Sequence, residues 1–169
     1  MKVAWVLLAT ALALALQTTL ARFVIRGTVA VDLVLVVVVY TALTSGPVTG
    51  LLTGTFAGLV QDALSSGVIG IGGLAKTVVG FLAGIIGTQF IVAQPLPRLV
   101  VFFVATVLHA VLFIGLYELL DLRQFGLPVG AVTGQALGNA IVGVVAFQLV
   151  ELLPGVIERR RMGRTRIRR

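Results

Sequence analysis

The side chains that could do chemistry are few, and most of them stand alone within apolar stretches. Asp62 and Lys76 flank a break at Ser65-Ser66-Gly67, so the carboxylate and the ammonium group could meet as an ion pair. Within a membrane, ionisable residues mark a functional site by default, because an unpaired charge is costly in hydrocarbon. The alternative is structural: Asp62 caps the segment that follows, and Lys76 extends outward to the interface. Both interpretations are open at this stage.

Further polar residues surround this pair in the sequence. Gln135 and Asn139 lie four residues apart and share one helix face, which favours hydrogen bonds between helices. Asp32 precedes an apolar run, where a carboxylate suits the start of a helix. The predicted polar cluster comprises Gln61, Asp62, Lys76, Gln135 and Asn139.

Catalytic motifs are missing from the sequence. It has no P-loop, no Gly-x-Ser-x-Gly turn and no His-Glu-x-x-His pair. It also has no cysteine, which excludes disulfides, thiolate chemistry and cysteine metal sites. The only histidine, His109, lies mid-helix, far in depth from Ser65 and Ser66, so no nucleophile and base are paired. The sequence predicts a protein that is not an enzyme and needs no metal or cofactor.

Composition places the chain in a membrane. Of its 169 residues, 59% are hydrophobic and 11% are charged, whereas a soluble domain carries about 25% charged residues. Runs such as 31–40 do not alternate apolar with polar residues, which favours an α-helical bundle over a β-barrel. We therefore predict an all-α membrane protein.

Six apolar stretches are long enough to be spans, and together they predict a compact six-helix bundle over residues 1–158. The first has the charge pattern of a signal peptide, but its length favours an uncleaved helix. Gln94–Arg98 reads as a loop, and Pro154-Gly155 as the end of the last helix. The predicted spans are Val3–Leu20, Val29–Thr44, Pro47–Leu64, Ile71–Val92, Leu99–Leu120 and Pro128–Leu153.

A basic tail, residues 159–169, supplies most of the net charge of +7. Short segments rich in arginine stay in the cytoplasm, so an even number of spans places both termini there. No stacking aromatics accompany the tail, which favours anionic lipid head groups over nucleic acid as its contact. The predicted membrane-surface residues are Arg159, Arg160, Arg161, Arg164, Arg166, Arg168 and Arg169.

Two glycine ladders repeat at every fourth position. Such a face lets another backbone approach closely, which favours helix association in lipid. The ladders pack the bundle internally, or they form a face for a partner's transmembrane helix; in the second case a bulky residue at Gly54 or Gly58 would weaken partner binding. Their similar sequences also predict a 3+3 inverted pseudo-repeat. The ladders are Gly46, Gly50, Gly54, Gly58 and Gly126, Gly130, Gly134, Gly138.

The segment from Gly46-Pro47 through Gln61-Asp62, with Ser65–Gly70 and Leu74–Gly84, resembles the MreD family of rod-shape-determining proteins. The six-span layout and Asp32 are also similar to that family. The resemblance implies a multi-pass, non-catalytic subunit of the elongasome in the bacterial cytoplasmic (inner) membrane, which supports lateral peptidoglycan synthesis. Its implied partners are MreC, the MreB filament system, a SEDS glycosyltransferase and a class B penicillin-binding protein.

The same family is similar in fold to the S-components of energy-coupling-factor transporters. This similarity implies an alternative function, the binding or transport of a small molecule. Such a site needs a cavity toward which polar groups converge. The polar cluster defined above is the candidate for those groups.

Overall fold

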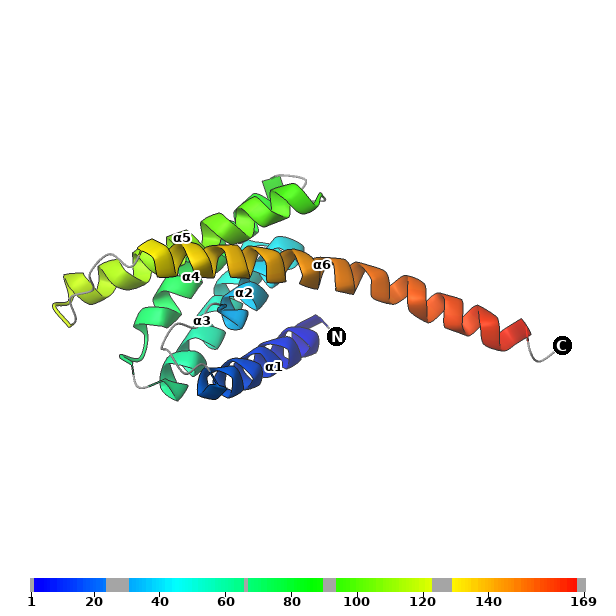
Figure 1. The fold of residues 1–169 in the computed structure, drawn as a ribbon, viewed down its shortest axis with the longest axis horizontal. Coiled ribbons are helices and arrows are strands. Elements are labelled where there is room, and N and C mark those ends of the chain that lie inside the picture. The colour runs from blue at the N-terminus through cyan, green and yellow to red at the C-terminus, as the bar shows by residue number, and fades with distance from the viewer. Residues whose placement is uncertain (1, 24–30, 66, 90–93, 123–128, 167–169) are drawn as a thin grey trace.

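The computed structural model describes residues 2–23, 31–65, 67–89, 94–122 and 129–166, and these are all-helical. The helix bounds predicted for the third apolar stretch are confirmed, because α3 covers the same residues. In Figure 1 the helices follow one another as α1 (Lys2–Phe23), α2 (Leu33–Ser45), α3 (Pro47–Leu64), α4 (Ile71–Gln89), α5 (Pro95–Leu119) and α6 (Val129–Arg166).

Two predicted boundaries are wrong, and proline is the reason in both. The segment Gln94–Arg98 is not a loop, since α5 already begins at Pro95. Proline is tolerated in the first turn of a helix, where its missing N–H would have had no partner. The last helix does not end at Pro154, because α6 continues to Arg166. One proline can kink a helix without ending it, and the arginines that follow are good helix formers.

The lengths of the helices support a membrane protein. Among the residues that the structure describes, three stretches are long and apolar enough to cross a bilayer: Ile71–Gln89, Pro95–Leu119 and Val129–Leu152. Ala4–Thr19 and Leu33–Ser45 are apolar but shorter. The 13 residues of α2 extend about 20 Å, less than the hydrocarbon core of about 30 Å. The predicted start of the second span at Val29, the predicted end of the fourth at Val92 and the predicted start of the sixth at Pro128 lie outside the described residues.

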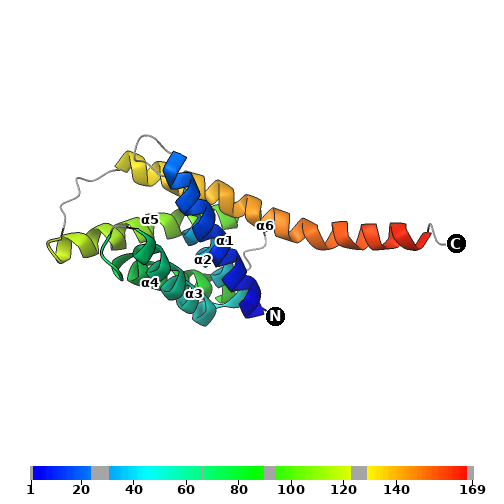
Figure 2. The ribbon, with the colours of Figure 1, turned by 90° about the horizontal axis from the view of Figure 1, so that it is seen from below.

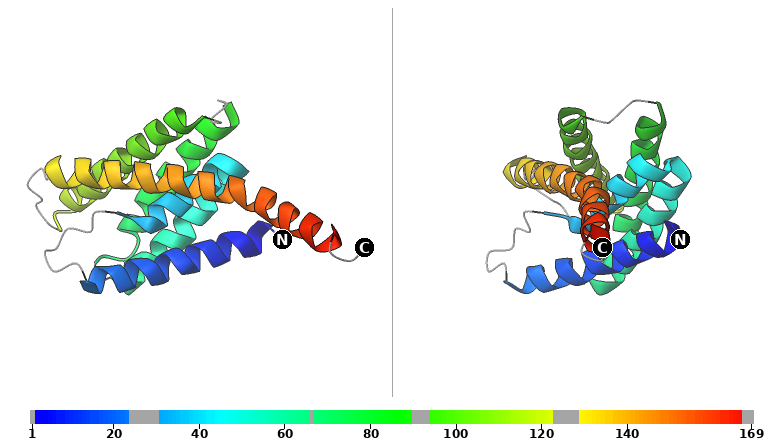
Figure 3. Two further views of the ribbon diagram at one scale, coloured as in Figure 1. Left: turned by 45° about the vertical axis from the view of Figure 1, so that its right-hand side comes forward. Right: turned by 90° about the vertical axis from the view of Figure 1, so that its right-hand side faces the viewer.

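The short helix α2 lies at the centre of the bundle. Its residues Val34, Leu35, Val38 and Val39 are almost completely buried. The other helices surround it: α3 and α4 lie together on one side, α5 and α6 on another, and α1 crosses the outside (Figures 1 and 2). The second half of α6 projects beyond the bundle, as Figure 3 also shows.

Aromatic side chains fill the contact between α2, α5 and α6. The rings of Tyr40 and Phe147 lie 4.4 Å apart, and Phe102 meets Phe147 edge-on at 6.2 Å. Near the start of α5, the guanidinium of Arg98 lies 4.3 Å above the Phe147 ring and also pairs with Glu151 on α6. This cluster fixes α6 along α5.

Candidate functional site

The first turn of α2 is buried inside the bundle, and side chains from other helices bind its free N–H groups. The Asp32 N–H donates to Asn139 Oδ1 at 2.8 Å, and the Leu33 N–H donates to Gln17 Oε1 at 2.9 Å. The Asp32 carboxylate caps the helix itself, because Oδ1 accepts from the Leu35 N–H at 3.0 Å. A helix end away from water needs such partners. The short α2 therefore requires polar side chains in the interior.

Lys76 neutralises the carboxylate at this helix start. Its Nζ lies 3.0 Å from Asp32 Oδ2, and the two side chains are only 4% and 7% exposed. The same Nζ lies 3.1 Å from His109 Nε2. An ammonium group can only donate, so Nε2 accepts and the neutral ring carries its proton on Nδ1. The Lys76 ammonium group therefore connects the Asp32 carboxylate to the neutral His109 ring.

Asn139 extends this arrangement to α5. Its amide nitrogen donates to Thr106 Oγ1 at 3.1 Å, while the Thr106 hydroxyl donates to the Phe102 carbonyl at 2.8 Å. Side chains from α1, α4, α5 and α6 thus connect to Asp32 at the start of α2, whereas the described residues of α3 take no part in this set. We call this set the buried polar network; its members are Gln17, Asp32, Lys76, Thr106, His109 and Asn139.

The buried polar network lies deep along the long helices. Ten residues separate His109 from the end of α5 at Leu119, and ten separate Asn139 from the start of α6 at Val129. Each separation is about 15 Å along the helix. Because the two charged side chains are only 4% and 7% exposed, an unpaired charge would have almost no water to contact, so the ion pair must be complete within the protein.

Asp62 and Lys76 do not pair. Asp62 Oδ2 accepts from the Gly70 N–H at 2.9 Å and the Gly73 N–H at 3.0 Å, so the carboxylate caps the start of α4. Lys76 does not extend outward either, because it is only 3% exposed. The reason is its position on the inner face of α4, opposite the Asp32 carboxylate. The structural interpretation is therefore correct in that Asp62 caps the following segment. For Lys76 both interpretations are wrong, since it neither pairs with Asp62 nor extends to the interface.

Of the remaining members of the predicted polar cluster, only Asn139 joins Lys76, because both contact Asp32. Gln61 Oε1 is buried without a hydrogen-bond partner, and Gln135 is partly exposed on α6. Asn139 is engaged in the buried polar network. Among the residues that the structure describes, no group of three or more His, Cys, Asp or Glu side chains could hold a metal ion.

The first glycine ladder packs α3 against α4. A Cβ on Gly50 would clash with the Gly80 carbonyl, and a Cβ on Gly54 with the Lys76 carbonyl. A Cβ on Gly58 would lie 2.5 Å from Gly73 Cα. Backbone contacts this close let Thr55 and Thr77 share a hydroxyl hydrogen bond at 2.8 Å across the interface.

This ladder is therefore not free to receive a partner, because α4 covers it at Gly50, Gly54 and Gly58. Gly46, at the joint of α2 and α3, has a φ of +89°, a backbone conformation that favours glycine. Bulky residues at Gly54 or Gly58 would disrupt the bundle before they could report on partner binding.

The second ladder has different surroundings. A Cβ on Gly130 or Gly134 would meet no heavy atom within 4 Å. Gly138 is partly buried, and Gly126 lies outside the described residues. Of the tail arginines, those up to Arg166 belong to the projecting part of α6, whereas Arg168 and Arg169 lie outside the description.

Sequence reasoning missed the pairing of Lys76 with Asp32 and His109. The available signal was the isolation of each residue: a single ionisable group in an apolar run needs a partner from another run. The partner's identity depends on how α2, α4 and α5 pack, which spacing along the chain does not specify.

Apolar helices joined by a complete buried ion pair and by glycine contacts form an all-α bundle that fits a membrane protein. Comparison with known families matches residues 1–154 to the family described as rod shape-determining protein MreD. The chain therefore belongs to the MreD family, which takes part in determining rod shape in bacteria. Comparisons with curated proteins and with solved structures gave no match.

Proposed function

We propose that this chain is a non-catalytic scaffold subunit of the elongasome that binds MreC and thereby supports lateral peptidoglycan synthesis. The observation that carries the proposal is the family match, which extends over residues 1–154 and so includes almost the whole helical body. MreB, the SEDS glycosyltransferase and the class B penicillin-binding protein are the further partners that we expect.

The chemistry of the interior supports a scaffold. Asp32, Lys76 and His109 satisfy one another, and Asp62 is engaged in capping α4. Polar groups used in this way hold helices in place and leave no activated nucleophile among the described residues. A rigid bundle is what a protein needs if its role is to position partners in the membrane.

The topology in this proposal has six crossings of the cytoplasmic membrane with both termini in the cytoplasm. Residues 1–158 form the membrane domain, and the arginines of 159–169 contact anionic head groups. The positive-inside rule supports this orientation. An S-component-like bundle with a 3+3 pseudo-repeat belongs to the same proposal.

The alternative, a subunit that binds or transports a small molecule, lacks a supporting observation in the described residues. Its candidate groups Asp62, Lys76 and Asn139 already bind partners within the protein. A ligand would have to displace those contacts.

The test is co-purification of the tagged chain with MreC from membranes, combined with complementation of a strain depleted of its own MreD. We expect MreC to be retained in mild detergent and rod shape to be restored. Rounded cells together with an isolated chain that retains no MreC would overturn the proposal.

A further inference from the structure

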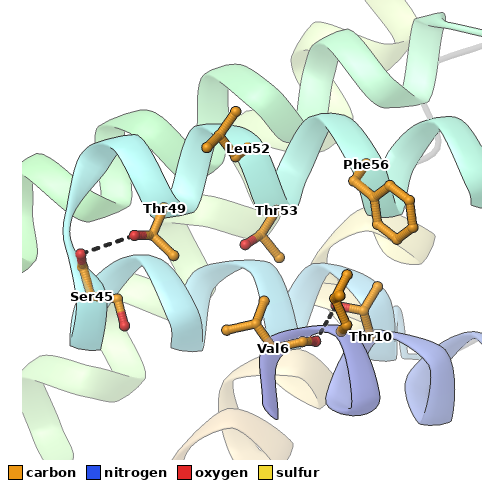
Figure 4. A pocket seen from close by; sticks show the side chains of 8 residues that line it. Val6, Thr10, Ser45, Thr49, Leu52, Thr53 and Phe56 are labelled. Carbon is orange, nitrogen blue, oxygen red and sulfur yellow. Dashed lines mark hydrogen bonds between the residues drawn. The ribbon is translucent and has the colours of Figure 1, made fainter. Parts of the chain in front are cut away.

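An open groove of about 480 Å³ lies between α1 and α3. Figure 4 shows its side chains from both helices facing one another across the opening. Leu7, Leu52 and Phe56 at its edges are 47%, 62% and 50% exposed. None of the residues along it is charged. The lining consists of Val6, Leu7, Thr10, Ser45, Thr49, Leu52, Thr53 and Phe56.

Thr53 is the unusual residue of this groove. The other helical threonines whose side chains are described each donate to a carbonyl about one turn back, as Thr10 does to Val6 and Thr49 does to Ser45. The Thr53 hydroxyl makes no hydrogen bond, although the residue is only 6% exposed. Its side chain points into the groove (Figure 4). A donor is therefore directed at the place where an occupant would lie.

The chemistry of this lining selects between two occupants. A lipid chain would fill the apolar space but could not accept a hydrogen bond from Thr53. A transmembrane helix offers carbonyl or hydroxyl oxygens as well as apolar surface, and threonine and serine are typical of helix interfaces in membranes. The absence of charge along the groove also suits an uncharged helix within hydrocarbon.

We propose that the α1–α3 groove binds one transmembrane helix of a partner protein, with an oxygen of that helix accepting from Thr53. The inference rests on the proposed function, which makes that helix the membrane span of MreC. The occupant should carry a small residue where it crosses Thr53, because only a small side chain lets an oxygen approach closely.

The first experiment fills the groove. Leu52→Trp places an indole at its exposed edge, and the matched control Val111→Trp makes the same change at a 61% exposed position on α5. Both variants should keep the melting temperature of the wild type in detergent. We expect Leu52→Trp to lose most of the co-purified MreC and Val111→Trp to retain it.

The second experiment removes only the hydrogen bond. Thr53→Val is nearly isosteric and should weaken association with the MreC span in nanodiscs about threefold, the effect of an average hydrogen bond between membrane helices. Thr53→Ser keeps the hydroxyl and should bind as the wild type does. Equal affinity for all three proteins would overturn the role of Thr53.

The third experiment maps the contact by cross-linking. Because the chain has no cysteine, Leu52→Cys gives a single reactive thiol in the groove. Oxidation against single cysteines along the MreC span should give products every three or four residues. Cross-linked pairs of this chain would instead identify a second copy as the occupant, and no product with any position of the MreC span would show that this helix does not lie in the groove; either result overturns the proposal.

These outcomes separate the two claims. If wild-type protein retains MreC and Leu52→Trp does so equally, the groove is not the binding site and the proposed function stands. If the wild type itself does not retain MreC, the proposed function fails, and the groove proposal fails with it because its occupant is that helix.

Discussion

Lys76 Nζ lies 3.0 Å from Asp32 Oδ2 although the two residues belong to different helices and are almost completely buried. Asp32 is also the N-cap of α2, so the pair connects the start of a short central helix to α4. His109 Nε2 lies 3.1 Å from the same ammonium group. The charge pair and the start of α2 therefore depend on each other.

Removing one charge of the Lys76–Asp32 pair should destabilise the protein more than removing both. Lys76→Met leaves the Asp32 carboxylate buried and unpaired, and we expect a loss of about 3–5 kcal/mol in the free energy of unfolding. The double variant Asp32→Asn with Lys76→Met should recover part of that loss. Denaturant titration in micelles measures both, and a single variant as stable as the wild type would contradict the buried pairing.

A methyl group should discriminate between the two glycine ladders. Gly54→Ala places a Cβ against the Lys76 carbonyl and should cost about 1–3 kcal/mol through overpacking. Gly134→Ala, where a Cβ meets nothing within 4 Å, should leave stability unchanged or gain up to about 1 kcal/mol of helix propensity. Thermal melting of the two variants side by side is sufficient. Equal melting temperatures would show that α3 and α4 do not touch at this point.

Loss of the Asp62 cap should loosen the start of α4 locally. Asp62→Ala removes the acceptor for the Gly70 and Gly73 N–H groups, and a lost cap costs about 0.5–2 kcal/mol. Asp62→Asn keeps one acceptor oxygen and should lose less. Hydrogen exchange should increase at Gly73 in the alanine variant, and unaltered exchange there would exclude the cap.

Single cysteines test the orientation of α6. Leu122→Cys follows α5, and Gly163→Cys lies near the far end of α6, so the two should label from opposite sides of the membrane. In the proposed topology, an impermeant maleimide applied to spheroplasts reaches position 122 and not 163. Labelling of position 163 from outside the cell would show that the proposed topology is inverted.

The order and approximate extent of the helices could be read from the chain because apolar length is a local property. The bounds of α3 followed from Pro47 at its start and the serines after Leu64. The resemblance to the MreD family could also be recognised from the sequence, because the motif from Gly46 to Gly84 is contiguous along the chain. The start of α5 and the end of α6 were predicted wrongly, because Pro95 and Pro154 allow a helix as well as a break.

What sequence determined, then, is the apolar body, the basic tail and the set of residues too polar for lipid. Tertiary structure alone decided which of those residues meet. Lys76 and Asp62 are separated along the chain only by a short connection between α3 and α4, yet Lys76 pairs with Asp32. The reason is that α2 begins inside the bundle, where the Asp32 carboxylate is buried away from water. Likewise the glycines of both ladders look alike in sequence, but α4 packs against Gly50, Gly54 and Gly58 of α3, whereas Gly130 and Gly134 of α6 face open space.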